Sequence, residues 1–155
     1  MDGCELDPIG VLVDAFPRLF RGKRPRVWSD LPIGWIDLVS NALSDVDAVL
    51  TRSPDHKRFE IEQIKEKFGR LRVYWKLARE GGLVLTVHEE TPSRFRTTPQ
   101  QPSQLFLAIR KRVDEAELAS ASVCQRCGTT PARTLGTGWL VTLCDACRIE
   151  TDAAP

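Results

Sequence analysis

The sequence predicts an α+β fold, with helices packed on a small antiparallel sheet and a cysteine-rich segment at the C-terminal end. Three observations support this prediction. Apolar residues recur at helical spacing in three segments, they alternate at strand spacing between about residues 59 and 88, and two CxxC pairs follow the last helical segment. The length of 155 residues suits one main domain. We therefore expect an α+β domain over residues 1–120 and a smaller unit, packed on it, over residues 121–155.

Composition excludes several classes of protein. Hydrophobic residues make up 42% and charged residues 28% of the chain, as is typical of folded proteins. No apolar run approaches the roughly 18 residues that a membrane-spanning helix needs. The acidic start of the chain, MDGCELDP, is unlike a signal peptide. We expect a cytoplasmic protein that does not associate with membranes.

Three helices are predicted. The first spans residues 8–19, where Asp7 is suited to the N-cap, a proline follows it, and a second proline ends or kinks the helix. The second spans residues 34–51 and carries apolar residues at alternating steps of three and four. The third spans residues 103–120 and begins at Ser103, which is a favourable N-cap.

The segment between the second and third helices has strand periodicity. Residues 70–77 alternate between apolar and polar side chains, and a Gly-Gly turn leads into a second such run at 83–88, which together indicate an antiparallel hairpin. Residues 59–67 can add a third strand, but their apolar residues do not keep to one face, and a helix is the alternative there. Residues 91–102 contain three prolines and few apolar side chains, which predicts a loop or linker.

The strongest local signal is the spacing of four cysteines: Cys124-x2-Cys127, sixteen residues, then Cys144-x2-Cys147. Each CxxC turn directs two sulfurs at one ion, and two turns supply the tetrahedral thiolate set that zinc prefers. Because four thiolates leave no open position, we expect one structural zinc ion per chain, with disulfides and an iron centre as alternatives. The expected order of knuckle, hairpin and helix predicts a treble-clef-like segment, and a zinc ribbon is the alternative.

The rest of the sequence offers little for catalysis. Only two histidines occur, His56 and His88, each in a polar context. The sequence contains no phosphate-binding glycine loop and no nucleophile elbow. Four thiolates contribute −4 and one zinc ion +2, so the formal net charge of +1 becomes −1, which argues against a basic field over the whole surface. We expect no enzymatic activity.

Two local groups of basic residues are candidates for contact with a partner or with nucleic acid. They are Arg21, Lys23, Arg24 and Arg26 in the first connector, and Arg70 and Arg72, with Tyr74, on the strand at 70–77. A basic strand face with an exposed aromatic ring can hold a nucleic-acid backbone and stack a base. The alternative is a solvated strand whose charges are balanced by Glu60, Glu62 and Glu66 on its neighbour.

Three motifs together resemble one group of proteins. They are DLPxGW at residues 30–35, QIKEKFGRLRVY at 63–74, and CxxCG with GWLVTLCD at 124–128 and 138–145. This combination resembles a widespread group of small, uncharacterised bacterial and prophage-associated zinc-binding proteins, and the resemblance covers residues 28–148. In that group the fourth ligand position is often histidine, whereas this chain has Cys147. The resemblance implies a fold, and only analogy extends it to functions such as those of immunity proteins or phage regulators.

Two functional hypotheses follow. The first is a non-enzymatic, zinc-binding accessory protein that acts by binding another protein, as immunity and regulatory proteins do. The second is a nucleic-acid-binding protein that uses the basic strand face and the basic connector. The closed metal site, the near-neutral charge and the missing catalytic set favour the first hypothesis.

Overall fold

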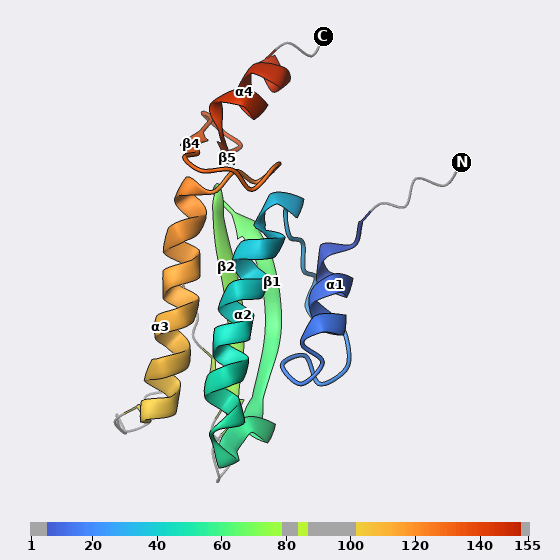
Figure 1. Ribbon diagram of the computed structural model, residues 1–155, viewed down its shortest axis with the longest axis vertical. Helices are drawn as coiled ribbons and strands as arrows, with labels where there is room; N and C mark the ends of the chain where they lie inside the picture. Colours follow the sequence, from blue (N-terminus) through green and yellow to red (C-terminus); the bar gives the residue numbers. More distant parts are fainter. Residues whose placement is uncertain (1–5, 79–83, 87–101, 153–155) are drawn as a thin grey trace, which may run out of the picture.

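The computed structural model describes residues 6–78, 84–86 and 102–152, and its fold is α+β (Figure 1). In the described chain, three α-helices and a three-stranded sheet are followed by a C-terminal two-stranded hairpin and a fourth helix. In chain order the elements are α1 (Pro8–Ala15), α2 (Ile36–Thr51), β1 (Phe59–Lys67), β2 (Arg70–Ala78), β3 (Val84–Thr86), α3 (Gln104–Ala119), β4 (Arg133–Leu135), β5 (Val141–Leu143) and α4 (Asp145–Asp152). Short 3₁₀ helices lie at Ile33–Trp35, Pro54–Arg58 and Ser120–Ser122.

The helices and the larger sheet enclose one apolar core. The strand order is β1-β2-β3, and both neighbouring pairs are antiparallel. Helices α2 and α3 lie side by side against this sheet, and α1 packs along the other side of α2 (Figure 1). At the centre, the Trp75 ring lies between those of Phe59 and Phe106, with centroid separations of 5.7 and 5.0 Å.

The helices lie close to the predicted segments, with one correction. Helix α2 begins after a 3₁₀ turn, and α3 begins where Ser103 Oγ accepts a hydrogen bond from Phe106 N at 3.1 Å. The prediction of a first helix over residues 8–19 is wrong beyond Ala15. Phe16 precedes a proline, which disfavours helical backbone angles, and Phe16 leaves the helical region. None of the described helices combines the length and the apolar character needed to cross a membrane.

Residues 59–67 form a strand rather than a helix, and a β-bulge explains their irregular pattern. Strand β1 pairs with β2, but the register shifts between Ile61 and Gln63. An extra residue at this point reverses which side chains face the core. Accordingly, Ile61 is buried before the bulge and Ile64 is buried after it.

The predicted hairpin is confirmed for the strands that the structure describes. Strand β3 pairs antiparallel with the C-terminal part of β2, where Leu77 lies opposite Leu85. The Gly-Gly turn, His88, Cys4 and most of the predicted loop, residues 91–101, lie outside the described residues.

Helix α3 covers the edge of β2 beyond this pairing. Buried N–H groups at a sheet edge need partners, and α3 supplies them. Leu71 N donates to Ser120 Oγ at 3.0 Å, and Val73 N donates to Glu117 Oε1 at 2.8 Å. These bonds fix the helix against the end of the sheet that carries the C-terminal unit.

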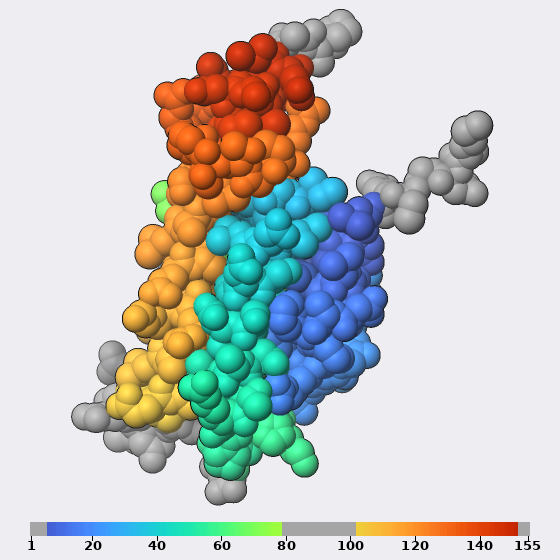
Figure 2. Space-filling view, in the orientation of Figure 1, coloured from blue at the N-terminus to red at the C-terminus, as the bar shows by residue number. Residues whose placement is uncertain are grey.

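The C-terminal unit, residues 123–152, sits on one end of the molecule (Figure 2). Its buried cluster is small and comprises Cys124, Ala132, Cys144 and Cys147, with Leu143 packed against it. So few apolar side chains cannot supply the folding free energy of an independent unit. One link to the main core is Trp35, which is fully buried and donates from Nε1 to Val123 O at 2.8 Å.

Replacing Trp35 by Phe tests this link. We expect Trp35→Phe to lower the free energy of unfolding by about 1–3 kcal/mol, because the carbonyl of Val123 loses its donor while it stays partly buried. Urea unfolding followed by circular dichroism measures the change. Trp28 is 72% exposed, so Trp28→Phe is the matched control and should leave stability within experimental error. Equal losses in both variants would contradict the assigned role of Trp35.

Candidate metal centre and basic sheet face

Both CxxC pairs lie where a regular element begins or ends. Cys124 and Cys127 occupy the turn that follows the 3₁₀ helix at Ser120–Ser122, Cys144 follows β5 directly, and Cys147 lies in the first turn of α4. The order along the chain is therefore knuckle, hairpin, helix. The second pair sits at a helix N-terminus rather than in a second hairpin knuckle.

The first CxxC turn is closed by its own backbone. Cys124 N donates to Thr129 O and Gly128 N donates to Cys124 O, both at 2.9 Å. Gly128 has φ of 76°, a left-handed conformation that favours glycine. Glycine is therefore suited to the position after Cys127.

The four sulfurs converge on one point. All four Sγ atoms lie within 4.8 Å of one another, and Cys127 Sγ is 3.6 Å from Cys144 Sγ. A tetrahedron with metal–sulfur bonds of about 2.3 Å has sulfurs about 3.8 Å apart, whereas a disulfide bond is about 2.05 Å long. The four cysteines are free thiols. The arrangement therefore suits one metal ion held by four sulfur ligands, and it does not suit two disulfides.

The electrostatics of the cluster also favour a bound cation. A hydrogen bond with the Thr129 hydroxyl, 3.2 Å from Cys127 Sγ, lowers the pKa of Cys127 to about 6. Burial acts to raise the pKa of Cys124, but backbone N–H groups, first that of Cys144, outweigh burial and lower it. The hydrogen bond with Cys127 raises the pKa of Cys147 to about 12. The site thus stabilises some thiolates at the expense of others, and a divalent cation allows all four to ionise.

The first CxxC turn packs closely against the backbone of Gly34 in the main domain. Gly34 N donates to Gln125 O at 2.9 Å. A Cβ atom on Gly34 would overlap the carbonyl oxygens of Cys124 and Gln125 and the nitrogen of Gly128. This close approach of two backbones requires glycine at position 34.

A second glycine, Gly69, binds the C-terminal hairpin through its backbone carbonyl. Residues 68 and 69 form the two-residue turn between β1 and β2, and both have positive φ, as in a type I′ turn. Gly69 O accepts a hydrogen bond from the buried hydroxyl of Thr142 at 2.6 Å. Thr142 Oγ1 in turn lies 2.8 Å from Thr134 Oγ1. The hairpin of β4 and β5 is therefore attached to the tip of the larger sheet.

Half of the four predicted basic residues of the first connector form ion pairs within the fold. Arg24 forms a bidentate pair with Asp7, with one contact of 3.0 Å, and its hydrogen bond lowers the pKa of Asp7 to about 2. Arg21 Nε lies 3.4 Å from Glu60 Oε2. Lys23 and Arg26 are exposed and make no ion pair with a described residue. Two of these four predicted contact residues thus stabilise the fold.

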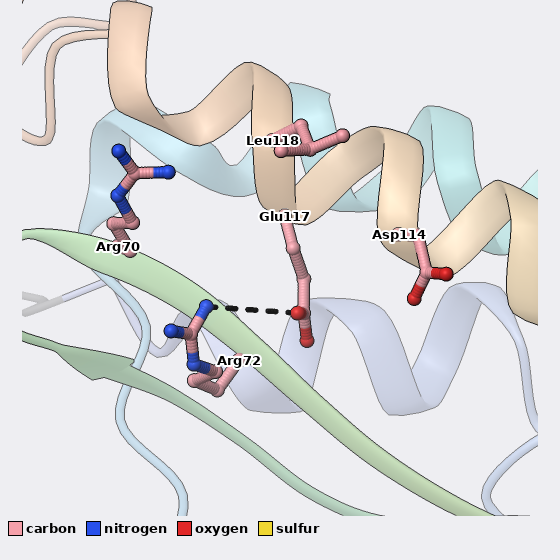
Figure 3. Close-up of a pocket in the computed structure, with 5 residues that line it drawn as sticks. All are labelled: Arg70, Arg72, Asp114, Glu117 and Leu118. Carbon is pink, nitrogen blue, oxygen red and sulfur yellow. Dashed lines mark ion pairs between the residues drawn. The ribbon is translucent and has the colours of Figure 1, made fainter. Parts of the chain in front are cut away.

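The basic strand residues do share one face, as predicted. Leu71 and its alternate neighbours point into the core, so Arg70, Arg72 and Tyr74 lie on the opposite face of β2. Figure 3 shows Arg70 and Arg72 rising from β2 toward α3, where Arg72 Nη1 lies 3.6 Å from Glu117 Oε2. Both arginines line a pocket of about 310 Å³ with Asp114, Glu117 and Leu118.

Glutamates of β1 were expected to offset the basic charges of this face, and they do so at only one end of it. There, Lys76 Nζ lies 3.1 Å from Glu60 and 3.4 Å from Glu62. The glutamate at position 66 faces the other way, because of the bulge, and its Oε1 accepts a hydrogen bond from Gly69 N.

At the other end, basic residues face basic residues. Lys65 lies opposite Arg72, and Lys67 lies opposite Arg70. Neither lysine was predicted to lie on this face, because unbroken alternation from Phe59 assigns both to the core side. The sequence signal for the bulge was the apolar side chain of Ile64, which is out of phase with Phe59 and Ile61.

Comparisons with protein-family models, with curated proteins and with solved structures found no match.

Loss of a single ligand tests the metal centre. We expect purified protein to contain about one zinc ion per chain and Cys144→Ser to retain little of it, because three remaining thiolates hold the ion more weakly. Elemental analysis measures the metal. Cys4→Ser removes the one cysteine outside the cluster and should keep the full zinc content. Full zinc content in Cys144→Ser would contradict the assignment of the four ligands.

Adding a methyl group at Gly34 tests the contact between this residue and the first CxxC turn. Gly34→Ala should lower the free energy of unfolding by about 1–3 kcal/mol and speed the release of metal to a chelator, because the new Cβ displaces the first CxxC turn. A Cβ on Gly138 meets no atom within 4 Å, so Gly138→Ala is the control and should behave as the unsubstituted protein. Unchanged metal release in Gly34→Ala would show that the turn does not depend on this contact.

Proposed function

We propose that this chain is a non-enzymatic nucleic-acid-binding protein in which a structural zinc ion folds the C-terminal unit. The observation that carries the proposal is the pairing of Lys65 with Arg72 and of Lys67 with Arg70 across the sheet. Like charges directly opposite one another destabilise a sheet. Two successive pairs of this kind are expected where a surface must attract a polyanion.

The metal has a structural role in this proposal. Four thiolates complete the coordination of zinc and leave no position for a substrate or an activated water. Soft sulfur ligands favour zinc or iron over magnesium or calcium. The order of knuckle, hairpin and helix, with Cys147 in α4, supports a treble-clef-like unit rather than a zinc ribbon.

The side chains of the basic face reach the surface of the protein. Lys65, Lys67 and Arg72 are partly exposed and Arg70 is exposed. Neither Lys65 nor Arg70 forms an ion pair with an acidic side chain of the described residues, and Lys65 Nζ lies 5.0 Å from the centroid of the Tyr74 ring. Four such cations can neutralise consecutive phosphates. The near-neutral overall charge then confines the attraction to this face.

Binding of another protein, by an immunity or regulatory type of accessory protein, is the second candidate function. The observation that favours it is the exposure of the large apolar residues Phe68 and Trp139 beside the basic face. The same-sign pairs favour a polyanion over a protein partner, because protein surfaces rarely present a continuous row of negative charge.

A single charge reversal separates binding from stability. In Lys67→Glu the pair with Arg70 becomes attractive, so the free energy of unfolding should rise by about 0.2–1 kcal/mol while nucleic-acid affinity falls about tenfold. Fluorescence anisotropy with a labelled oligonucleotide measures affinity, and urea unfolding measures stability. With four phosphate contacts, the logarithm of the binding constant should fall with the logarithm of salt concentration with a slope of about −3.

Lys23→Glu is the matched control. It makes the same change in net charge at an exposed residue that forms no ion pair with the described chain. Affinity should change less than twofold, and stability should not change. Equal loss of affinity in the two variants would indicate attraction by net charge alone. The absence of binding at low salt would remove nucleic acid as the ligand.

A further inference from the structure

Two exposed aromatic rings lie at the end of the sheet where the C-terminal unit is seated. Phe68, in the turn between β1 and β2, is 62% exposed, and Trp139, between β4 and β5, is 80% exposed. They line one pocket of about 230 Å³ together with Glu66, Lys67, Gly138 and Leu140. Two large rings exposed beside one pocket form an apolar patch that the fold does not bury, and such patches mark contact sites.

The rings are continuous with the basic face. Lys67 lines the aromatic pocket, its Nζ lies 5.3 Å from the centroid of the Phe68 ring, and its residue pairs with Arg70 across the sheet. The sequence of side chains along the surface is therefore aromatic, basic, basic and aromatic, from Trp139 and Phe68 through the lysine–arginine pairs to Tyr74.

The described acidic residues that border this surface already have partners. Glu66 Oε1 accepts the hydrogen bond from Gly69 N, and Glu117 holds Val73 N and pairs with Arg72. Asp114 pairs with Arg110 at 3.3 Å. Asp114 and Glu117 form the border of the surface on the side of α3 (Figure 3).

We propose that the basic sheet face and the Phe68–Trp139 pocket together bind single-stranded nucleic acid, with phosphates on the lysine–arginine pairs and a base stacked against the exposed rings. This inference rests on the proposed function and names its ligand. Proteins that bind single strands combine a basic track with aromatic stacking platforms, whereas the bases of a duplex are stacked on one another and present no free face. One platform, Trp139, belongs to the unit that the metal folds, and the basic track belongs to the sheet.

The experiment compares labelled oligo(dT) with a duplex of equal length on the zinc-loaded protein. We expect oligo(dT) to bind at least tenfold more tightly than the duplex at the same salt concentration. Trp139→Ala and Phe68→Ala should each weaken oligo(dT) binding about tenfold, which lies within the usual range for loss of one stacking contact. Trp28→Ala removes a tryptophan that is 72% exposed but lies outside the pocket, and it should weaken binding less than twofold.

Two further measurements separate stacking from structural damage. Trp139→Ala removes no charge, so the salt slope should stay unchanged, whereas Lys67→Glu should make it shallower. Oligo(dT) should quench the tryptophan fluorescence of the unsubstituted protein. Trp139→Phe should lose this quenching yet keep the affinity, because phenylalanine also stacks. Zinc content should equal that of the unsubstituted protein in every variant.

The outcomes distinguish this inference from the proposed function. Equal binding of duplex and oligo(dT), or full affinity in Trp139→Ala together with a loss in Lys67→Glu, would overturn the single-strand inference and leave nucleic-acid binding in place. The absence of binding to both nucleic acids at low salt would overturn both proposals, and the pocket would then be assigned to a protein partner.

Discussion

Four cysteine sulfurs from two distant segments must meet at one point, and the C-terminal end of this protein depends on that meeting. All four lie within 4.8 Å of one another, on a turn and on the start of a helix that share only a small buried cluster. Hydrophobic burial of this size cannot hold the hairpin of β4 and β5 in place. A metal ion bound by the four thiolates would supply the missing free energy, because metal binding is coupled to folding.

The C-terminal unit is positioned by two glycines of the main domain. Gly34 lets the backbone of the first CxxC turn approach the start of α2, and Gly69 accepts the hydrogen bond of Thr142 from the hairpin. Residues 30–35, 63–74, 124–128 and 138–145 therefore meet at a single junction. That junction also brings Trp139 beside Phe68, at the end of the basic face.

Periodicity predicted most of the fold, because the elements that bury one regular stripe leave a clear pattern. Helix α2 and strand β2 are such elements. The convergence of the cysteines was predicted on another ground, the geometry of CxxC turns. The prediction was wrong where one residue changes the local conformation. Phe16 before a proline ended α1 early.

The bulge in β1 had the larger consequence for the candidate site. One extra residue moved Lys65 and Lys67 onto the face of Arg70 and Arg72 and turned Glu66 away from it. Acidic and basic residues alternate in the sequence at the C-terminal end of β1, but the bulge leaves only basic side chains at this end of the face. Contacts between distant backbones, such as that of Gly34 with Gln125, left no periodic signal at all.

Hydrogen exchange with and without a strong chelator tests most directly whether the metal folds the C-terminal unit. After removal of zinc, amide protection should be lost in β4, β5 and α4, while α2, α3 and the paired residues of β1 and β2 keep theirs, because these belong to the separate main core. Unchanged protection of Val141–Leu143 and Asp145–Asp152 in metal-free protein would contradict a metal-folded unit, and so would an equal loss of protection over the whole described chain.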